Sequence, residues 1–372
     1  MLKFRRPIRL RHAAGLLAVA AALAVASPAA QAQTTAAAPA FSYQLDWLQV
    51  PAQYRLGEIA SVAVDASDNV WILHRPRSVA AADRDKAAPA VLAFDSSGKF
   101  IRAWGGPGQG YEWPTNEHSL FVDAKNRVWL SGNSAAAASP DHTILAFTAE
   151  GQFIRQIGKQ GASKGDQDTE NVNRVADIFV DAARNELYAA DGYGNRRIIV
   201  FDTETGAFKR MWGAFGAAPP ATPPGPPLPA MRPPGIADQE GRGSLEFRSV
   251  HGVEVSKDGL VYVSDRDHQR IQVFDRMGRY KTQVFVHRNA ASRQTAGGLA
   301  LSPDQRWLYV VDFGNSQLVV FDRKTLKEVA SIGSNGVAPG QFVGPHLMAT
   351  DSKGVVYIAE VSGRRLQRLI PR

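Results

Sequence analysis

Short apolar runs separated by polar turns recur along most of the chain. The runs are four to seven residues long and rich in Val, Ile, Leu, Phe and Tyr, whereas the turns contain Asp, Asn, Gly and Ser. Runs of this length and composition are typical of β-strands, not of amphipathic helices. Pairs of runs repeat six times, at residues 62–73, 120–130, 178–189, 252–263, 298–309 and 348–358. No long helix is expected.

Each repeat predicts one blade of a β-propeller. Most copies continue with a third run that ends in Phe-Asp and a fourth that ends in Trp-Gly or Ile-Gly. Four short antiparallel strands per copy, repeated six times, predict an all-β, six-bladed β-propeller of four-stranded antiparallel blades. The last copy stops one strand short at residues 365–370, and residues 43–50 form a strand without a blade. We therefore expect the N-terminal strand to complete the last blade and close the ring.

Residues 1–32 have the features of a secretory signal peptide. Five basic residues precede an Ala, Leu and Val run from Ala13 to Ala26, and Ala30-Gln31-Ala32 offers a small-x-small cleavage site. The apolar run is too short for a membrane span. We expect a periplasmic or secreted protein without a membrane span after signal cleavage. It would consist of a flexible segment at 33–42 and a propeller at 43–372 with a Pro-rich insertion at 217–234.

Charge and cysteine content exclude some functions. Loss of the signal peptide removes five basic and no acidic residues, so the formal net charge falls from +8 to +3. A nucleic-acid partner is therefore not expected. The chain has no cysteine, which excludes disulfides, thiolate metal ligands and a thiol nucleophile.

Three histidines occupy the same position of the repeat in every second copy. His118, His251 and His346 each lie five residues before an equivalent point, in copies two, four and six. Alternate blades of a six-bladed ring lie about 120° apart around its axis, so the three imidazoles should converge. Three imidazoles with an open position form a typical catalytic zinc site, although other divalent metals also fit. A polar ring around a water-filled channel is the alternative.

Two arginines and a tyrosine are expected on the same face of the ring. Arg75 and Arg266 follow the second run of copies one and four, which face each other, and could grip a carboxylate. Tyr193 lies in the equivalent loop of copy three, where nearby cations would favour a phenolate that can act as a base. Surface salt bridges and a packed loop tyrosine are the alternatives. The Pro-rich insertion overhangs this face, as a lid or as a tolerated loop.

Several motifs resemble known families. Residues 333–346 have the pattern Gly-x-x-Gly-x-x-x-Gly-x-Phe-x-x-Pro-His, which, together with the six repeats, resembles the NHL-repeat family of six-bladed propellers. The His74-Arg75 pair, the three histidines and the runs 191–198 and 265–272 are similar to the peptidyl-α-hydroxyglycine α-amidating lyase family. This resemblance covers about residues 43–370.

The resemblance implies an enzyme, a carbon–nitrogen lyase. In that family the histidines hold zinc, the tyrosine is the proposed base and the arginines contact the substrate, a carbinolamide that is split into an amide and glyoxylate. By resemblance, the zinc ligands are His118, His251 and His346, and the catalytic residues are Tyr193, Arg75 and Arg266.

The chain departs from the family at three positions. Leu347 stands where the family often has an aspartate ligand to a central calcium, which argues against calcium here. Gly344 replaces a methionine of the family's site, and Gly194 replaces a cysteine of the tyrosine loop. No copper monooxygenase domain that would make the hydroxyglycine is present in this sequence, so the substrate could be a small molecule instead of a peptide.

Three functions remain open at this point. The first is the lyase, acting as a monomer on a small molecule or peptide that carries a carboxylate. The second is a metal-dependent hydrolase of the lactonase or esterase type, against which the three-histidine set argues because such sites normally use carboxylate ligands. The third is a non-enzymatic propeller that presents one face to a binding partner.

Overall fold

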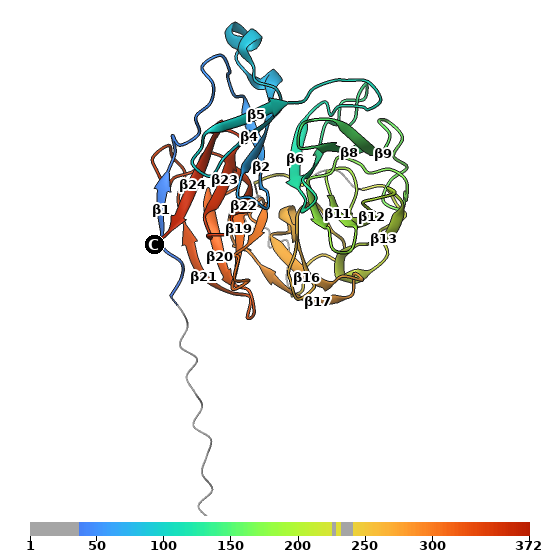
Figure 1. The fold of residues 1–372 in the computed structure, drawn as a ribbon. Helices are drawn as coiled ribbons and strands as arrows, with labels where there is room; N and C mark the ends of the chain where they lie inside the picture. Colours follow the sequence, from blue (N-terminus) through green and yellow to red (C-terminus); the bar gives the residue numbers. More distant parts are fainter. Residues whose placement is uncertain (1–36, 225–227, 232–240) are drawn as a thin grey trace, which may run out of the picture. The chain divides into compact units, whose positions relative to one another are not determined.

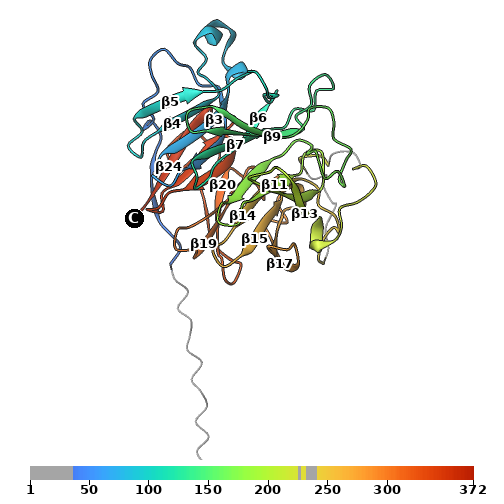
Figure 2. The ribbon, with the colours of Figure 1, turned by 45° about the vertical axis from the view of Figure 1, so that its right-hand side comes forward.

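The chain folds into six four-stranded antiparallel sheets arranged in a ring (Figures 1 and 2). The computed structural model describes residues 37–224, 228–231 and 241–372. The expected signal peptide and parts of the Pro-rich insertion lie outside the described residues. Within the described residues, no helix has the length and apolar character that crossing a bilayer requires. The six-bladed propeller predicted from the repeats is confirmed.

The blades follow one another along the chain. Blade one contains β2 (Glu58–Val64), β3 (Val70–Arg75), β4 (Val91–Phe94) and β5 (Phe100–Trp104). Blade two contains β6 (Glu117–Val122), β7 (Arg127–Gly132), β8 (Thr143–Thr148) and β9 (Phe153–Gly158). Blade three contains β10 (Asp177–Asp181), β11 (Glu186–Asp191), β12 (Arg197–Asp202) and β13 (Phe208–Trp212).

The second half of the ring has the same order. Blade four contains β14 (Val250–Val255), β15 (Leu260–Asp265), β16 (Arg270–Asp275) and β17 (Tyr280–Phe285). Blade five contains β18 (Leu299–Leu301), β19 (Trp307–Asp312), β20 (Gln317–Asp322) and β21 (Lys327–Ile332). Blade six contains β22 (Pro345–Thr350), β23 (Val356–Glu360), β24 (Arg365–Pro371) and β1 (Phe41–Gln44). The described helices are short 3₁₀ turns: η1 (Pro76–Ser78), η2 (Ala81–Lys86), η3 (Ala214–Gly216) and η4 (Arg266–His268).

An aspartate at the end of several inner strands fixes the turn to the second strand. The Asp123 carboxylate accepts the backbone N–H groups of Lys125 at 2.9 Å and Arg127 at 3.0 Å, and the indole N–H of Trp129 at 3.0 Å. Because Trp129 is fully buried, one carboxylate ties the turn to the core. Asp65 makes the same kinds of bond in blade one. This bonding explains why the Asp and the following aromatic residue recur in the repeat.

The core lies between neighbouring blades. Trp129 and Ile144 of blade two share one buried cluster with Ile178, Leu187 and Phe201 of blade three. Each blade thus covers the face of the next, which is how a propeller buries both faces of its sheets. This packing fixes the inner strands around the central axis.

The N-terminal strand closes the ring, although its bounds differ from the prediction. β1 pairs antiparallel with β24, from Phe41 opposite Pro371 to Gln44 opposite Arg368 (Figure 1, blue beside red). The strand begins within the segment predicted to be flexible and ends at Gln44, so residues 45–50 are a turn and loop and not a strand. Trp47 in this loop is buried against Tyr357, with ring centroids 5.4 Å apart. The apolar pattern at 43–50 therefore reflects packing against blade six as well as strand pairing.

A cavity of about 190 Å³ lies along the axis and is lined by the inner strands of all six blades. Two carboxyl groups, from Asp177 and Glu254, belong to its lining. Burial raises the pKa of Asp177 to about 7. Burial, and then the neighbouring Asp177, raise the pKa of Glu254 well above its ordinary range. Both groups therefore favour the protonated form in the folded protein.

Ring closure by β1 predicts that two N-terminal truncations differ sharply in melting temperature. A chain that begins at Leu45 loses β1, the buried Phe41 side chain and one covered sheet edge, whereas a chain that begins at Pro39 keeps them. Truncating a buried Phe side chain alone costs about 3–5 kcal/mol. We expect the shorter chain to melt on the order of 10 °C lower. Equal melting temperatures in calorimetry would contradict closure by this strand.

The raised pKa of Asp177 predicts a pH-dependent stability. Between about pH 4 and 7 the unfolded carboxyl ionises while the folded one keeps its proton, so this group makes the protein less stable as pH rises. Asp177→Asn mimics the protonated form and removes this contribution. We expect a smaller loss of melting temperature between pH 5 and pH 8 in this variant than in the wild type. The exposed Asp83→Asn is the control, and equal pH dependence in wild type and Asp177→Asn would refute the assignment.

Candidate metal centre

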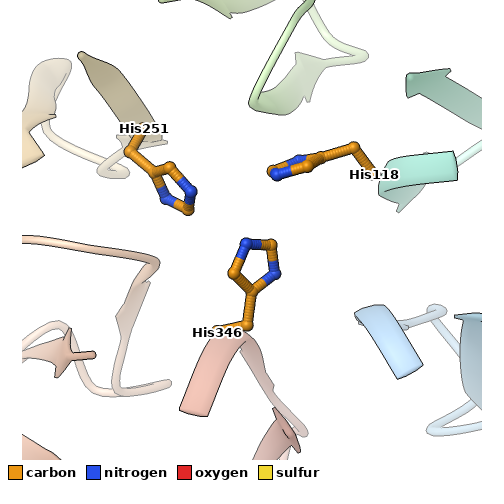
Figure 3. A group of neighbouring side chains, drawn as sticks. All are labelled: His118, His251 and His346. Carbon is orange, nitrogen blue, oxygen red and sulfur yellow. The ribbon is translucent and has the colours of Figure 1, made fainter. Parts of the chain in front are cut away.

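The structure brings the three predicted histidines together at one end of the axis (Figure 3). His118 lies on β6, His251 on β14 and His346 on β22, the inner strands of blades two, four and six. One ring nitrogen of each lies within 4.8 Å of those of the other two. Ring centroids are 4.7 to 5.4 Å apart and the ring planes are steeply inclined. Three nitrogen atoms are thus gathered around one point, as a metal ion requires.

Blades one, three and five carry small residues at the repeat position that the histidines occupy in the other blades. These small residues are Ala60, Ala176 and Gly297. His118 Nδ1 lies 2.8 Å from the Ala176 carbonyl oxygen, and His346 Nδ1 lies 2.7 Å from that of Ala60. A carbonyl oxygen only accepts, so both Nδ1 atoms carry the proton and both Nε2 atoms keep a free electron pair. Each of these histidines is oriented for coordination by the next blade.

His251 is held differently. Its expected partner by repeat position, the Gly297 carbonyl oxygen, accepts the Ser264 hydroxyl at 2.6 Å instead. The Nδ1 atom of His251 is buried and has no hydrogen-bond partner among the described residues. A buried polar nitrogen without a partner is costly in free energy, and no hydrogen bond to Nδ1 from the described residues orients the His251 ring.

All three imidazoles favour the neutral form that binds metals. Burial, followed by the positive charges nearby, lowers the pKa of His118 and His251 well below the ordinary value. Burial lowers the pKa of His346 to about 3. Neutral, buried and converging imidazoles fit a divalent metal ion, and these three residues could hold one.

Tyr193 lies against this centre. Its hydroxyl oxygen is 3.1 Å from His118 Nε2 and 3.0 Å from His251 Nε2. The loop that carries it joins β11 to β12 and is fixed by the buried Asp191 carboxylate, which accepts hydrogen bonds from Asn195 and Arg197. The sequence prediction that this loop reaches the histidine face agrees with the geometry.

Gly192 allows the Tyr193 loop to approach the next blade. A Cβ atom added at Gly192 would overlap the backbone of Val250, one residue before His251. Any other residue would push the loop away from β14. The glycine thus sets the distance between the tyrosine of blade three and the histidine of blade four.

Both predicted arginines face the centre. Arg266 donates to the Tyr193 hydroxyl at 3.2 Å and to Asp267 at 2.9 Å. Burial alone would lower the pKa of Arg266, but Tyr193 and Asp267 raise it above its ordinary value. Arg75 is held by the Glu58 carboxylate at 2.8 Å and by the Glu117 carbonyl oxygen at 2.9 Å. Its charge helps to lower the pKa of His118 and His346, so it acts on the same centre.

The remaining described histidines have structural surroundings. His74, which precedes Arg75, is buried with its Nε2 3.0 Å from the Pro89 carbonyl oxygen. His268 pairs with the Asp265 carboxylate at 2.9 Å. His142 accepts the Ser163 N–H at 3.2 Å and lies outside the cluster. His287 pairs with the Asp312 carboxylate at 2.5 Å.

Sequence reasoning missed a group of arginines beside the centre. A pocket of about 380 Å³ adjoins Tyr193 and Arg266, and its lining includes Arg174, Arg196 and Arg248. Arg174 and Arg248 lie in the loops that lead into β10 and β14, the same kind of loop that precedes each histidine. The sequence signal for Arg174 and Arg248 was their position directly before an inner strand. The comparison of repeats did not identify them, because they do not occupy the same position of the repeat.

The NHL repeat family model matches residues 247–274, from the loop before β14 into β16. NHL repeat-containing protein 3 of Mus musculus is 26% identical over 344 residues, which cover 90% of this chain and 85% of that protein. The chain thus contains an NHL repeat within its six-bladed β-propeller. The similarity to the mouse protein extends over most of the chain, whereas the family model matches a single repeat.

The chain also matches part of a longer protein. It is 22% identical over 346 residues to peptidyl-glycine alpha-amidating monooxygenase B of Xenopus laevis. The match covers 88% of this chain but 35% of that protein, so the chain corresponds to about a third of it.

Two solved structures share the fold of this propeller. A streptogramin B lyase structure has a TM-score of 0.52 at 12% identity and covers 89% of this chain and 98% of its own. A protein of unknown function from Bacteroides thetaiotaomicron has a TM-score of 0.55 at 15% identity, with coverages of 86% and 70%. At these identities the likeness concerns the fold alone.

The histidine cluster predicts that the propeller binds one divalent metal ion. His251→Ala should lose most of the bound metal after dialysis, because two imidazoles bind far more weakly than three. The β-sheet circular dichroism should stay unchanged, since the core between blades holds the ring. Metal is measured by elemental analysis of the purified protein. His142→Ala is the matched control, and full metal occupancy in His251→Ala would eliminate the site.

Proposed function

We propose that this propeller is a zinc-dependent lyase that splits an α-hydroxyglycine-type carbinolamide into an amide and glyoxylate. The observation that carries the proposal is the Tyr193 hydroxyl, which lies within hydrogen-bond distance of two ring nitrogens of the cluster and of Arg266. A proton acceptor, a candidate metal centre and a cationic group thus meet at one point.

The reaction needs few groups. The carbinol oxygen loses its proton, the C–N bond breaks as the C=O bond of glyoxylate forms, and the departing amide nitrogen takes up a proton. Zinc held by His118, His251 and His346 would polarise the carbinol oxygen. Tyr193 would accept the hydroxyl proton and return a proton to the nitrogen after the C–N bond breaks.

The two arginines would orient the substrate. The Arg266 guanidinium contacts the Tyr193 hydroxyl, so a carboxylate held by this arginine would place the adjacent carbon near the proton acceptor. Arg75 is anchored by Glu58 and contributes positive charge from the opposite side of the ring. A substrate carboxylate between two guanidinium groups would have little freedom to rotate.

The relatives support this assignment in part. The Xenopus laevis protein carries the amidating activity in its name, and its match covers 88% of this chain. The identity is low and most of that protein has no counterpart here. NHL repeat-containing protein 3 has no activity in its name, so a binding scaffold is the second candidate.

The decisive substrate is α-hydroxyhippurate, a minimal carbinolamide with a carboxylate. We expect the zinc-loaded protein to release glyoxylate, and a chelator to abolish the release. Tyr193→Phe keeps the ring but removes the ionisable oxygen, so kcat should fall on the order of 10²-fold or more. Tyr54→Phe, at a tyrosine remote from the cluster, is the control. Unchanged rates in Tyr193→Phe would remove this residue from the mechanism.

The arginines have a separate expected effect. Arg75→Ala and Arg266→Ala should lower kcat/KM, roughly 10- to 100-fold for the loss of one charge-assisted contact, with KM affected as well. Arg102→Ala, at an exposed surface pair with Glu150, should leave both constants unchanged. Absence of glyoxylate from the fully zinc-loaded wild type would exclude the lyase and favour the scaffold or a hydrolase.

A further inference from the structure

The Pro-rich insertion forms part of the pocket beside the metal centre. Pro224 and Leu228 of the insertion line this pocket of about 380 Å³, together with Tyr193 and Arg266. The rest of the described chain contributes polar side chains, two glycines and the tyrosine to the lining. Pro224 and Leu228 are thus the only aliphatic side chains among the described residues of this pocket, and we call them the apolar wall.

The first part of the insertion is anchored beside the Tyr193 loop. Arg196, three residues after Tyr193, donates to the Thr222 carbonyl oxygen, and Gln167 donates to the Pro219 carbonyl oxygen at 3.2 Å. Arg196 is itself buried, so the propeller fixes the position of this anchor. The insertion is therefore tied to the same loop that carries the proposed proton acceptor.

A second anchor follows the apolar wall. The Arg293 N–H donates to the Ala230 carbonyl oxygen at 2.8 Å, and Met231 forms an antiparallel bridge with Ser292. Both contacts involve the loop from β17 to β18, and Gln294 of this loop also lines the pocket. The described residues before and after the apolar wall are thus both held to the propeller through their backbone.

The composition of the insertion makes the apolar wall stiff. Prolines occupy positions 219, 220, 223, 224 and 229, and each pyrrolidine ring fixes the backbone φ angle of its residue. Leu228 is half-buried, so part of its apolar surface is still available to a ligand. Covering this surface with an apolar group would be favourable, because it removes both surfaces from water.

We propose that the apolar wall binds the acyl group of the substrate, so that the enzyme prefers carbinolamides with a compact apolar acyl part. The proposal rests on the proposed lyase function and names its substrate class. Arg266, which would hold the carboxylate, and Tyr193, which would take the hydroxyl proton, line the same pocket as Leu228. The acyl group on the amide nitrogen of a substrate bound there would lie within reach of the wall.

The size of the pocket favours a compact acyl group. Its volume of about 380 Å³ lies near the lower end of the range for small-molecule sites, about 300–1,000 Å³. The reacting glycine unit occupies part of this space. One ring or short aliphatic chain would fill the remainder.

The test compares α-hydroxyhippurate, which has a benzoyl group, with N-acetyl-α-hydroxyglycine. The zinc-loaded wild type should show a kcat/KM roughly 10-fold or more higher for the benzoyl compound. Leu228→Ala should lower this ratio about 5-fold or more. The loss should appear as a higher KM for the benzoyl compound with kcat unchanged, because the wall contacts the acyl group equally before and during the reaction.

Two further variants serve as controls. Leu228→Met keeps an apolar side chain of similar volume and should keep most of the ratio. Met277→Ala removes an exposed apolar side chain from the turn between β16 and β17 and should leave the ratio unchanged. Equal kcat/KM values for the two substrates in the wild type, or an unaltered ratio in Leu228→Ala, would overturn the proposal.

A binding measurement separates this proposal from the lyase itself. N-benzoylglycine and N-acetylglycine lack the carbinol hydroxyl and cannot react, so calorimetry on the zinc-loaded protein measures binding without turnover. Tighter binding of the benzoyl compound, weakened in Leu228→Ala, would support the apolar wall even if no carbinolamide were cleaved. Equal binding of the two compounds, or binding of neither, would overturn the wall, and glyoxylate release in the same preparation would leave the lyase standing.

Discussion

The pairing of β1 with β24 is the constraint on which the candidate site depends. The three histidines belong to separate blades that contact one another only through the ring, and their nitrogen atoms converge because the inner strands surround one axis. Without this pairing, blades one and six could separate at their contact, where His346 Nδ1 donates to the Ala60 carbonyl oxygen. Four residues at the start of the fold therefore help to hold a geometry formed by residues 118 to 346.

The site combines a metal-binding cluster with surrounding positive charge. Arg75 and Arg266 both disfavour protonation of the imidazoles, which keeps the cluster ready for a cation without an acid among its ligands. A bound divalent ion would add further positive charge. Such a site has an electrostatic preference for anionic ligands. The proposed carboxylate substrates follow from this charge distribution.

The repeat made most of the fold and part of the site predictable. Strand order, blade number and the convergence of His118, His251 and His346 all follow from residues that recur at fixed positions. Features that do not recur in every repeat were missed or misplaced. β1 begins at Phe41, earlier than its apolar pattern suggests, because pairing with β24 sets its start. Arg174 comes next to Tyr193 only through the path of a loop, and Asp177 shares a cavity with Glu254 only when two inner strands meet.

The unequal anchoring of the histidines has a mechanical consequence. His118 and His346 are clamped to neighbouring blades, whereas the Ser264 hydroxyl occupies the carbonyl that would clamp His251. Two of the imidazoles are therefore oriented by a backbone carbonyl oxygen, whereas His251 is oriented by packing and by its contact with the Tyr193 hydroxyl at 3.0 Å. If a metal ion is bound here, the orientation of its third ligand thus depends on the loop of blade three that carries Tyr193.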